Sequence, residues 1–240
     1  MRRLLALTGV GVYAASLYGT YRYLSLFSGA PKAHSCGHGG CGQWDALADS
    51  YDREVGFDEV LMGMRLLRWW LLSRAKGDVL EVSAGTGRNL PFYAPRQLTS
   101  LTLTDSSRGM LFHARKKAAA KPLGAAVRVA APPRGDASGA GALVPALRVY
   151  EPATFSTVVD TFGLCSHADP VATLREMAAV CKPDGQLLLL EHGRATAEWV
   201  NERLDGQAER HCAKFGCQWN RPILDIVAEA GLEVERVSRW

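Results

Sequence analysis

The sequence lacks a strong excess of either charge. Its 28 basic and 24 acidic residues are spread along 240 positions and give a net charge of +4. No dense basic tract follows the N-terminus, and no patch combines basic with aromatic residues, so the charge permits nucleic-acid binding without indicating it. The length is that of one ordinary domain with an appendage, and it is ample for a buried core.

One stretch near the N-terminus lacks charged residues of either sign. Leu4 to Tyr21 carry no charged side chain and are flanked by arginines. This is about the minimum length that spans a bilayer as a helix. We predict that residues 1–28 form a membrane anchor or a targeting segment. Its glycine, alanine and serine residues would let another transmembrane helix pack closely, so the predicted partners are the membrane, partner helices and a larger membrane complex.

Acidic residues are also absent before Asp45, which fits mitochondrial targeting. Pro31 and the lack of a clear small-x-small site argue against a cleaved secretory signal. Arginines flank the uncharged stretch at both ends, so the membrane orientation stays open.

Residues 29–43 are too rich in glycine for regular structure, and we predict a linker there. The segment holds four residues of zinc-ligand type, but their spacing matches no standard zinc finger: His34, Cys36, His38 and Cys41. A linker with a disulfide or free thiols is therefore favoured, and we predict no metal site. Cys165 and Cys181 lie in apolar surroundings and are predicted to be buried thiols.

Apolar periodicity alternates between strand and helix from residue 44 onward, which predicts a domain over residues 44–240. Strands are predicted at 79–82, 98–104, 126–130, 155–161, 186–191 and 232–240. Helices are predicted at 44–76, 106–121, 169–180 and 196–230, the last with a break around Gly216 and Pro222. A further helix is predicted to begin at 88–93, and a Pro/Gly/Ala-rich insertion occupies 131–151. The alternation predicts an α/β fold with a mostly parallel sheet covered on both faces.

The first predicted strand runs into a loop of small residues, Ser83 to Gly87. Gly85 and Gly87 lack a Cβ, so the backbone can turn sharply and a ligand can lie against its amides. Asp105 ends the second strand, roughly 20 residues farther on, where a carboxylate can accept hydrogen bonds from both hydroxyls of a ribose. An N-cap for the following helix is the alternative role for this aspartate. Loop and acid together predict a site for an adenosine cofactor.

These features in this order resemble the class I S-adenosylmethionine-dependent methyltransferases, and the resemblance covers residues 44–240. It is carried by the loop at 79–87, Asp105, the strand at 155–160, the turn at 181–185 and the pair Glu191-His192. The resemblance implies a Rossmann-like sheet with helices on both faces.

Two subgroups resemble the chain in more detail. Residues 44–52 are similar to the stretch that precedes the core in ubiquinone and menaquinone biosynthesis methyltransferases. A closer resemblance is to membrane-anchored methyltransferase-like proteins, namely alkyl thiol methyltransferases and a yeast mitochondrial inner-membrane protein. These share Leu164-Cys165-Ser166, Glu191-His192, Gly216-Cys217 and Asn220-Arg221. The resemblance implies a mitochondrial inner-membrane location, with the endoplasmic reticulum or another internal membrane as the alternative.

The implied cofactor is S-adenosylmethionine, and nine residues would bind it: Tyr51, Glu81, Ser83, Ala84, Gly85, Gly87, Asp105, Met110 and Asp160. The loop amides would face its methionine end, with Glu81 orienting the loop or reaching the amino group. Asp105 would hold the ribose, and Met110 would lie against the adenine. Tyr51 would close over the methionine portion, with a core position as its alternative.

Asp160 would lie near the sulfonium, at the mouth where the acceptor enters. The candidate catalytic residues are Asp160 and His192, and His167 and His211 are further candidate bases. A structural role is an equal alternative for each of these four.

Three departures from the family pattern stand out. Ser83 replaces the usual first glycine of the loop. The usual acidic-small pair after the third strand is missing or displaced to Asp136-Ala137. The sequence ends at Trp240, where the resemblance calls for one more antiparallel strand, so we expect an exposed sheet edge that invites a partner chain.

The resulting functional prediction is a membrane-anchored methyltransferase that acts on a small apolar acceptor such as a quinone, a lipid or a thiol. The alternative is a methyltransferase-like structural subunit or assembly factor of a mitochondrial membrane complex, with weak or no catalysis. A nucleic-acid methyltransferase ranks third, because no asparagine-proline catalytic motif follows Val159.

Overall fold

The computed structural model describes residues 41–120, 123–131, 147 and 149–238. The predicted anchor at 1–28, most of the predicted linker and the pair Asp136-Ala137 lie outside these ranges. Within the described part of the chain, no helix is both long and apolar enough to cross a membrane.

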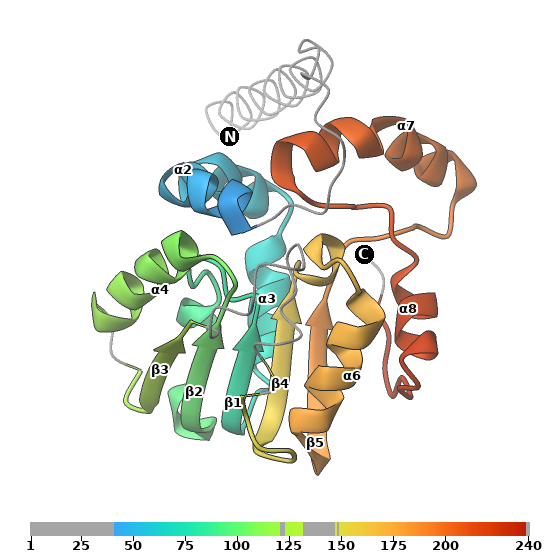
Figure 1. Ribbon diagram of the computed structural model, residues 1–240. Coiled ribbons are helices and arrows are strands. Elements are labelled where there is room, and N and C mark those ends of the chain that lie inside the picture. Colours follow the sequence, from blue (N-terminus) through green and yellow to red (C-terminus); the bar gives the residue numbers. More distant parts are fainter. Residues whose placement is uncertain (1–40, 121–122, 132–146, 148, 239–240) are drawn as a thin grey trace, which may run out of the picture. The chain divides into compact units, whose positions relative to one another are not determined.

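The centre of the fold is a five-stranded sheet in which every pairing is parallel (Figure 1). Its strands are β1 (Gly77–Val82), β2 (Leu98–Thr104), β3 (Ala126–Ala130), β4 (Phe155–Thr161) and β5 (Cys181–Leu190). The order is β3-β2-β1-β4-β5, so the chain reverses its direction across the sheet between β1 and β4. In open parallel sheets, ligands bind beyond the carboxyl ends of the strands at this switch point. The prediction of a parallel α/β sheet is confirmed.

Side chains alternate between the two faces of the sheet because successive residues of a strand point in opposite directions. Leu80, Val82 and Val158 pack on one face with α6 (Pro170–Val180) and α8 (Ile223–Glu229). Val79, Leu101 and Val159 pack on the other face with α3 (Met64–Leu72) and α4 (Arg108–Ala120). Figure 1 shows these helices on opposite sides of the strands. Both faces of the central strands are therefore buried, as parallel sheets require.

Local signals set the helix bounds. Asp169 caps α6, because its side chain accepts a hydrogen bond from the backbone N–H of Ala172 at 2.8 Å and Pro170 occupies the first helical position. The two remaining long helices are α2 (Cys41–Leu61) and α7 (Glu198–Phe215), and 3₁₀ turns occur at Leu90–Phe92, Pro95–Gln97 and Leu164–Ser166. The predicted thiols Cys165 and Cys181 are buried.

Several predicted elements differ from the structure. The single helix expected at 44–76 is two helices, because Gly63 adopts a φ of 70° between them. The first of these begins at Cys41, inside the predicted linker. The helix expected to begin at 88–93 is only the 3₁₀ turn at 90–92, since Tyr93 is extended and Pro95 follows closely.

The C-terminal side of the sheet also differs from expectation. Strand β5 begins at Cys181, so the turn expected at 181–185 is an irregular stretch of strand opposite Phe155–Thr157. The strand predicted at 232–240 is wrong for the residues described, because 232–238 contain no strand. Among the described residues, no strand pairs with the outer side of β5.

Candidate functional site

The loop after β1 reverses direction through residues with positive φ. Ser83, Gly85 and Gly87 have φ values of 53°, 55° and 77°. A Cβ on Gly87 would lie 2.9 Å from a methyl carbon of Leu90 and 3.2 Å from the Cα of Ala114. A Cβ on Gly85 would meet no atom within 4 Å. The two glycines thus differ in role: Gly87 lets the loop pack on α4, whereas Gly85 borders open space.

Asp105 lies beside this loop, at the end of β2. Its Oδ2 accepts a hydrogen bond from the backbone N–H of Gly85 at 2.8 Å, and its Oδ1 accepts one from Ser107 N–H at 2.8 Å. Burial raises the pKa of this carboxyl to about 6. The N-cap alternative is not realised by Asp105, because Ser107 Oγ accepts from the N–H of Met110 at the start of α4.

Asp160, at the end of β4, is fully buried, and neither of its carboxylate oxygens makes a hydrogen bond of ordinary geometry, although the Ser83 hydroxyl is close enough to offset part of the rise in its pKa. Its Oδ1 lies only 2.2 Å from the position that a Cβ on Gly163 would take, and Ser83 Oγ lies 2.4 Å from the same position. The absence of a side chain at Gly163 therefore brings the ends of β1 and β4 together. A buried carboxyl without a partner is costly, and such a group points to a ligand or a catalytic role.

A second buried acid, Glu191, follows β5. Its Oε1 accepts from the N–H of Gly163 at 3.2 Å, while its Oε2 has no partner. Burial holds the pKa of both carboxyls well above their usual range, and negative neighbours add to the rise, Glu81 and Asp105 at Asp160 and Asp160 itself at Glu191. Two such acids cannot both be ionised in an apolar site without a cation, so the pair retains a proton or binds a positive charge.

His167 faces the same loop from the other side. Its Nε2 lies 3.1 Å from Ser83 Oγ, and burial lowers its pKa to about 4, so the ring is neutral at neutral pH. The buried Arg221 donates to the carbonyl of His167 at 2.7 Å and fixes this segment. Ser83, which replaces the usual first glycine of the family's loop, thus has His167 as its hydrogen-bond partner.

Glu81 lies beneath the loop rather than open to it. Its Oε1 accepts from Asn89 Nδ2 at 3.0 Å and its Oε2 accepts from the Tyr93 hydroxyl at 2.7 Å. Arg68 extends this network, donating to Asn89 Oδ1 at 2.7 Å and to Thr161 Oγ1 at 2.9 Å. Burial raises the pKa of Glu81 to about 7. The geometry therefore suits a residue that orients the loop.

Helix α2 covers the loop with a stripe of acids that sequence reasoning missed. Asp52 accepts from Thr86 Oγ1 at 2.6 Å and pairs with Arg88 and Lys117. Glu59 pairs with Arg68 and Arg88. Asp45 accepts hydrogen bonds from the Ser107 hydroxyl and the Gly109 N–H at the start of α4. The stripe was visible in the sequence as acids three, four and seven residues apart: Asp45, Asp49, Asp52 and Glu59.

The remaining predicted residues fall in two places. Tyr51 lies on α2 with its ring edge-on to Trp44, and burial raises its pKa to about 12. Met110 and Ala84 are buried near the loop. His192 lies beyond β5, with its ring 5.4 Å from that of Phe162, and His211 stacks on Trp219 at 3.9 Å. Asp160 and His192 therefore flank the segment that follows β4.

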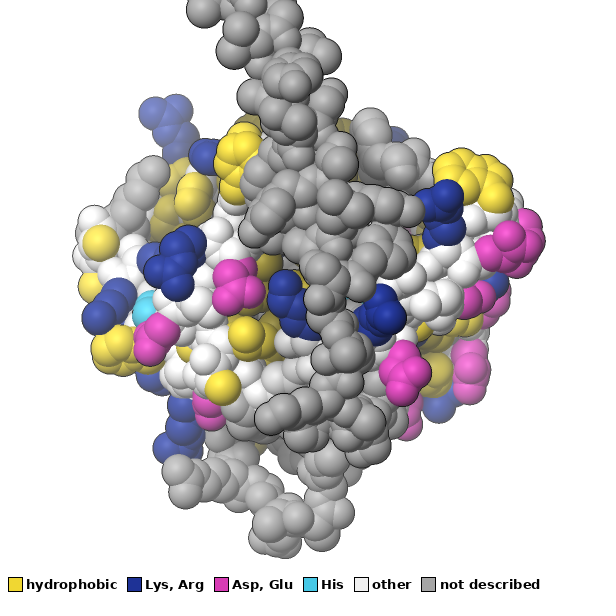
Figure 2. All heavy atoms as spheres, turned by 90° about the horizontal axis from the view of Figure 1, so that it is seen from above, with side chains coloured by type: hydrophobic (Ala, Val, Ile, Leu, Met, Phe, Trp, Pro, Cys, Tyr) yellow, Lys and Arg dark blue, Asp and Glu magenta, His cyan; other side chains and the backbone are white. Residues whose placement is uncertain are grey.

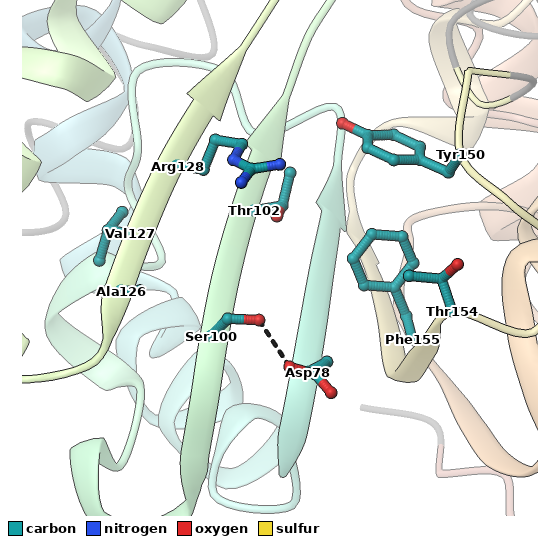
Figure 3. Close-up of a pocket in the computed structure, with 9 residues that line it drawn as sticks. All are labelled: Asp78, Ser100, Thr102, Ala126, Val127, Arg128, Tyr150, Thr154 and Phe155. Atoms are coloured by element: carbon teal, nitrogen blue, oxygen red, sulfur yellow. Dashed lines mark hydrogen bonds between the residues drawn. The ribbon is translucent and has the colours of Figure 1, made fainter.

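A cavity of about 630 Å³ lies elsewhere, over the amino-terminal halves of the strands. Figure 3 shows Asp78 and Ser100 on its floor, joined by a 2.8 Å hydrogen bond, with Arg128 on one side and Tyr150 with Phe155 on the other. These residues are not those of the loop, so this cavity is distinct from the candidate site. Figure 2, which views the molecule from above, shows acidic and basic side chains interspersed, without a field of one sign.

Residues 56–237 match the profile of a family described as methyltransferase domain. The chain belongs to the class I S-adenosylmethionine-dependent methyltransferases. The family expectation is thereby confirmed, and S-adenosylmethionine is the cofactor of this methyltransferase.

Individual relatives agree with the family. The mitochondrial methyltransferase OMS1 of Saccharomyces cerevisiae is 35% identical over 201 residues, which are 80% of this chain and 42% of that protein. The chain thus spans less than half the length of the yeast protein. A phosphatidylethanolamine N-methyltransferase of Cereibacter sphaeroides is 30% identical over 152 residues, 62% of this chain and 68% of that protein.

A solved structure shows the same fold. It is an O-methyltransferase family protein from Burkholderia thailandensis, with a TM-score of 0.58 and 21% identity, and the alignment covers 82% of this chain and 56% of that chain.

The residues around the loop fit the cofactor chemically. S-adenosylmethionine carries a sulfonium and an ammonium group, and the partnerless carboxyl of Asp160 offers a buried acceptor for positive charge. The open space beside Gly85 leaves its backbone accessible to a ligand, and Asp105 is nearby for hydroxyl groups.

Proposed function

We propose that this methyltransferase is a membrane-anchored enzyme that transfers a methyl group from S-adenosylmethionine to a small apolar acceptor, such as a quinone, a lipid or a thiol. The observation that carries the proposal is Asp160, a fully buried carboxyl without a partner, at the switch point of the sheet and beside an accessible glycine loop. Most buried polar groups in native proteins are paired, so an unpaired carboxyl calls for an explanation, and a positively charged ligand supplies one.

The proposed cofactor contacts follow the geometry of the site. The amides from Ser83 to Gly87 line the methionine end, with Ala84 as part of the loop wall and Gly85 as the point of closest approach. Asp105 accepts hydrogen bonds from the ribose with the lone pairs that its two backbone donors leave unused. Met110 packs against the adenine, and Tyr51 covers the methionine portion from α2. Glu81 acts indirectly, because Asn89 and Tyr93 occupy both of its oxygens.

The bound cofactor supplies an electrophilic methyl group on a positively charged sulfur. The chain contributes alignment of the acceptor with that methyl and exclusion of water, which together account for much of the rate of an in-line displacement. Asp160 and His192 flank the segment after β4, where the acceptor enters, and either can take a proton from the acceptor there. Asp160 acts as a base only in its ionised form, which the positive charge of the bound cofactor would stabilise against the effect of burial.

Several features support a membrane acceptor. The uncharged stretch from Leu4 to Tyr21 is long enough to span a bilayer. Large apolar side chains are exposed around the junction of α2 and α3, among them Met62, Leu66 and Trp69 at 63%, 70% and 58%. Exposed apolar groups of this kind favour contact with a membrane or a partner. One relative is named mitochondrial, which supports a mitochondrial location, and another is named for a phospholipid, which supports a lipid acceptor. The inner membrane is the location that we propose.

The cofactor claim is tested by calorimetric titration of the full-length protein in detergent with S-adenosylmethionine and its demethylated product. We expect saturable binding that Asp160→Asn weakens by at least tenfold, whereas Asp184→Asn, an exposed aspartate in β5, leaves it unchanged. Absence of binding to the unsubstituted chain would contradict the enzyme proposal.

One observation favours the alternative function, a methyltransferase-like subunit or assembly factor of a mitochondrial membrane complex. Both oxygens of Asp105 already accept backbone hydrogen bonds, so the loop is satisfied without a ligand. Stoichiometric co-purification with a membrane complex, together with intact biological function in Asp105→Ala, would establish that alternative over catalysis.

The anchor claim is tested by alkaline extraction of membranes from cells that express the protein. We expect the chain to remain in the membrane pellet. Val10→Lys, at the middle of the uncharged stretch, should shift it toward the soluble fraction, because a lysine at the bilayer centre costs about 2.5–3.5 kcal/mol.

A further inference from the structure

Two cysteines and a histidine meet just beyond the carboxyl ends of β4 and β5. The ligand atoms of Cys165, His192 and Cys217 all lie within 4.8 Å of one another. His192 Nε2 is 3.0 Å from Cys217 Sγ. Both cysteines are buried and His192 is half-buried. We propose that these three residues form a binding site for a zinc ion.

The donor set suits zinc rather than a hard cation. Thiolate and imidazole ligands select zinc and other soft metals, whereas magnesium and calcium require oxygen ligands. In a tetrahedral zinc site with bonds of about 2.0–2.3 Å, neighbouring ligand atoms are about 3.5–3.8 Å apart. His192 Nε2 and Cys217 Sγ, 3.0 Å apart, are closer than that, and no two of the three ligand atoms are farther apart than 4.8 Å. Small movements of the side chains would therefore bring them to zinc-binding distances.

The backbone that carries the three ligands is already held in place. Gln218 N–H donates to the carbonyl of Cys165 at 2.9 Å, which ties the segment of Cys217 to that of Cys165. Phe162 N–H donates to the carbonyl of Leu190 at 2.8 Å, which ties the segment before Cys165 to the end of β5. A site whose ligands are fixed before the metal arrives loses little conformational entropy on binding.

A buried cation also stands beside the cysteines. The guanidinium of Arg221 donates to the carbonyls of Leu164 and His167, at 2.9 Å and 2.7 Å, on either side of Cys165. Arg221 therefore fixes the backbone on both sides of Cys165. A hydrogen bond with Cys217 and burial hold the pKa of the Cys165 thiol well above its usual range, so metal binding must release the proton of that thiol.

Three protein ligands leave one tetrahedral position open, the arrangement that distinguishes catalytic from structural zinc sites. The site also borders the candidate cofactor site, because Cys165 Sγ contacts the carbonyl of Phe162 at 3.3 Å and Gly163 lies against Asp160 and Ser83. The zinc proposal stands on the geometry of the three ligands and does not rest on the proposed function. With zinc bound to His192, only Asp160 of the two candidate bases would be left to take the proton of the acceptor.

The test uses the full-length protein, purified under reducing conditions, with Cys36→Ser and Cys41→Ser in every sample so that the linker cysteines cannot bind metal. Zinc is added in slight excess, the protein is desalted, and bound metal is measured by mass spectrometry. We expect about one zinc per chain. Cys165→Ser and Cys217→Ser should each lower the zinc affinity at least tenfold, and His192→Asn should also weaken it.

Cys181→Ser is the matched control, because Cys181 is equally buried but lies outside the cluster. This control should retain the metal. X-ray absorption at the zinc edge should report two sulfur ligands and at least one nitrogen.

If a serine variant does not fold, cobalt binding to the protein without substitutions in the cluster tests the site instead. Cobalt added to protein that retains Cys165, Cys181, Cys212 and Cys217 should give thiolate-to-cobalt charge-transfer absorption, which added zinc should abolish. Three results would overturn the proposal: only trace metal in the loaded protein, zinc that persists when Cys165 and Cys217 are both replaced, or a disulfide between them found by peptide mass analysis of thiol-blocked protein. Zinc bound by a chain that fails to bind S-adenosylmethionine would still support it.

Discussion

Asp105 Oδ2 accepts a hydrogen bond from the backbone N–H of Gly85 at 2.8 Å, and this bond joins the end of β2 to the loop after β1. The same carboxylate accepts from Ser107 N–H, so one side chain fixes the loop, the strand end and the start of α4. The loop is therefore shaped before any ligand binds.

Asp105→Asn should weaken both the loop and cofactor binding. An amide group keeps one acceptor oxygen but turns an N–H₂ toward a backbone donor, which costs about 1–3 kcal/mol of stability. Loss of charged hydrogen bonds to the ribose should weaken S-adenosylmethionine binding about 10- to 100-fold. Thermal unfolding and calorimetric titration measure the two effects. Equal affinity of the variant and the unsubstituted protein would remove Asp105 from the cofactor site.

Gly85→Ala and Gly87→Ala should differ in their effects on stability and on cofactor affinity. Both positions have positive φ, which costs alanine about 1–2 kcal/mol. Only the Gly87 variant also presses its new methyl against Leu90 and Ala114, which should add about 1–3 kcal/mol. We expect the Gly87 variant to unfold at a clearly lower temperature and the Gly85 variant mainly to lose cofactor affinity.

The control for backbone strain alone is Gly231→Ala, whose φ is +80° and whose surroundings are open. It should match the Gly85 variant in stability and the unsubstituted protein in affinity. Identical melting temperatures for the Gly85 and Gly87 variants would contradict the division of roles.

The sequence predicted the sheet and its loop because these depend on local pattern. Strands such as 98–104 and 155–161 carry their own periodicity, and Gly85, Gly87 and Asp105 lie at strand ends whose position follows from it. The boundary errors have local causes that the pattern concealed, such as the left-handed Gly63 within a continuous apolar periodicity.

The rest of the candidate site depends on contacts between distant segments. The pairing of Asp52 with Thr86 and Lys117 requires α2 to lie over the loop, which no local signal gives. The meeting of His192 with Cys217 likewise depends on where the chain returns after α7. The prediction of no metal site rests on the closely spaced residues 34–41. Spacing along the sequence gives no information about ligands that tertiary structure brings together.

Arg68→Met should be strongly destabilising. Arg68 is buried and donates to Asn89, Thr161 and Glu59, so its loss leaves their acceptor oxygens without this partner. Removing one member of a buried ion pair typically costs about 3–5 kcal/mol. Arg65→Met, on the same helix but exposed, should change the unfolding free energy by no more than about 0.5 kcal/mol. Denaturant unfolding of the two variants gives the comparison, and similar midpoints would contradict a central role for Arg68.

The buried acids should make the cofactor-free protein less stable as the pH rises. Folding raises the pKa of Glu81 to about 7 and that of Asp105 to about 6, so the folded state binds more protons than the unfolded state. The stability that these groups contribute is fully present below their unfolded pKa values near 4 and is lost as the pH rises through 6 and 7. His167 and His211, whose folded pKa values are about 4, oppose this trend because their contribution is lost as the pH falls from about 6.5.

The variant Asp160→Asn isolates the contribution of this one acid to the pH dependence of stability. The histidines and the other carboxyls are present in both the variant and the unsubstituted protein, so their effects are common to both. The pKa of Asp160 is raised well above its usual range, so its contribution disappears with rising pH and an asparagine removes that dependence. The unfolding free energy of the variant, measured by urea titration between pH 4 and 8, should therefore fall less steeply than that of the unsubstituted protein. Saturating S-adenosylmethionine should reduce the difference, since a bound cation stabilises the ionised carboxylate. Parallel pH profiles for the two proteins would mean that Asp160 keeps an ordinary pKa and already has a partner.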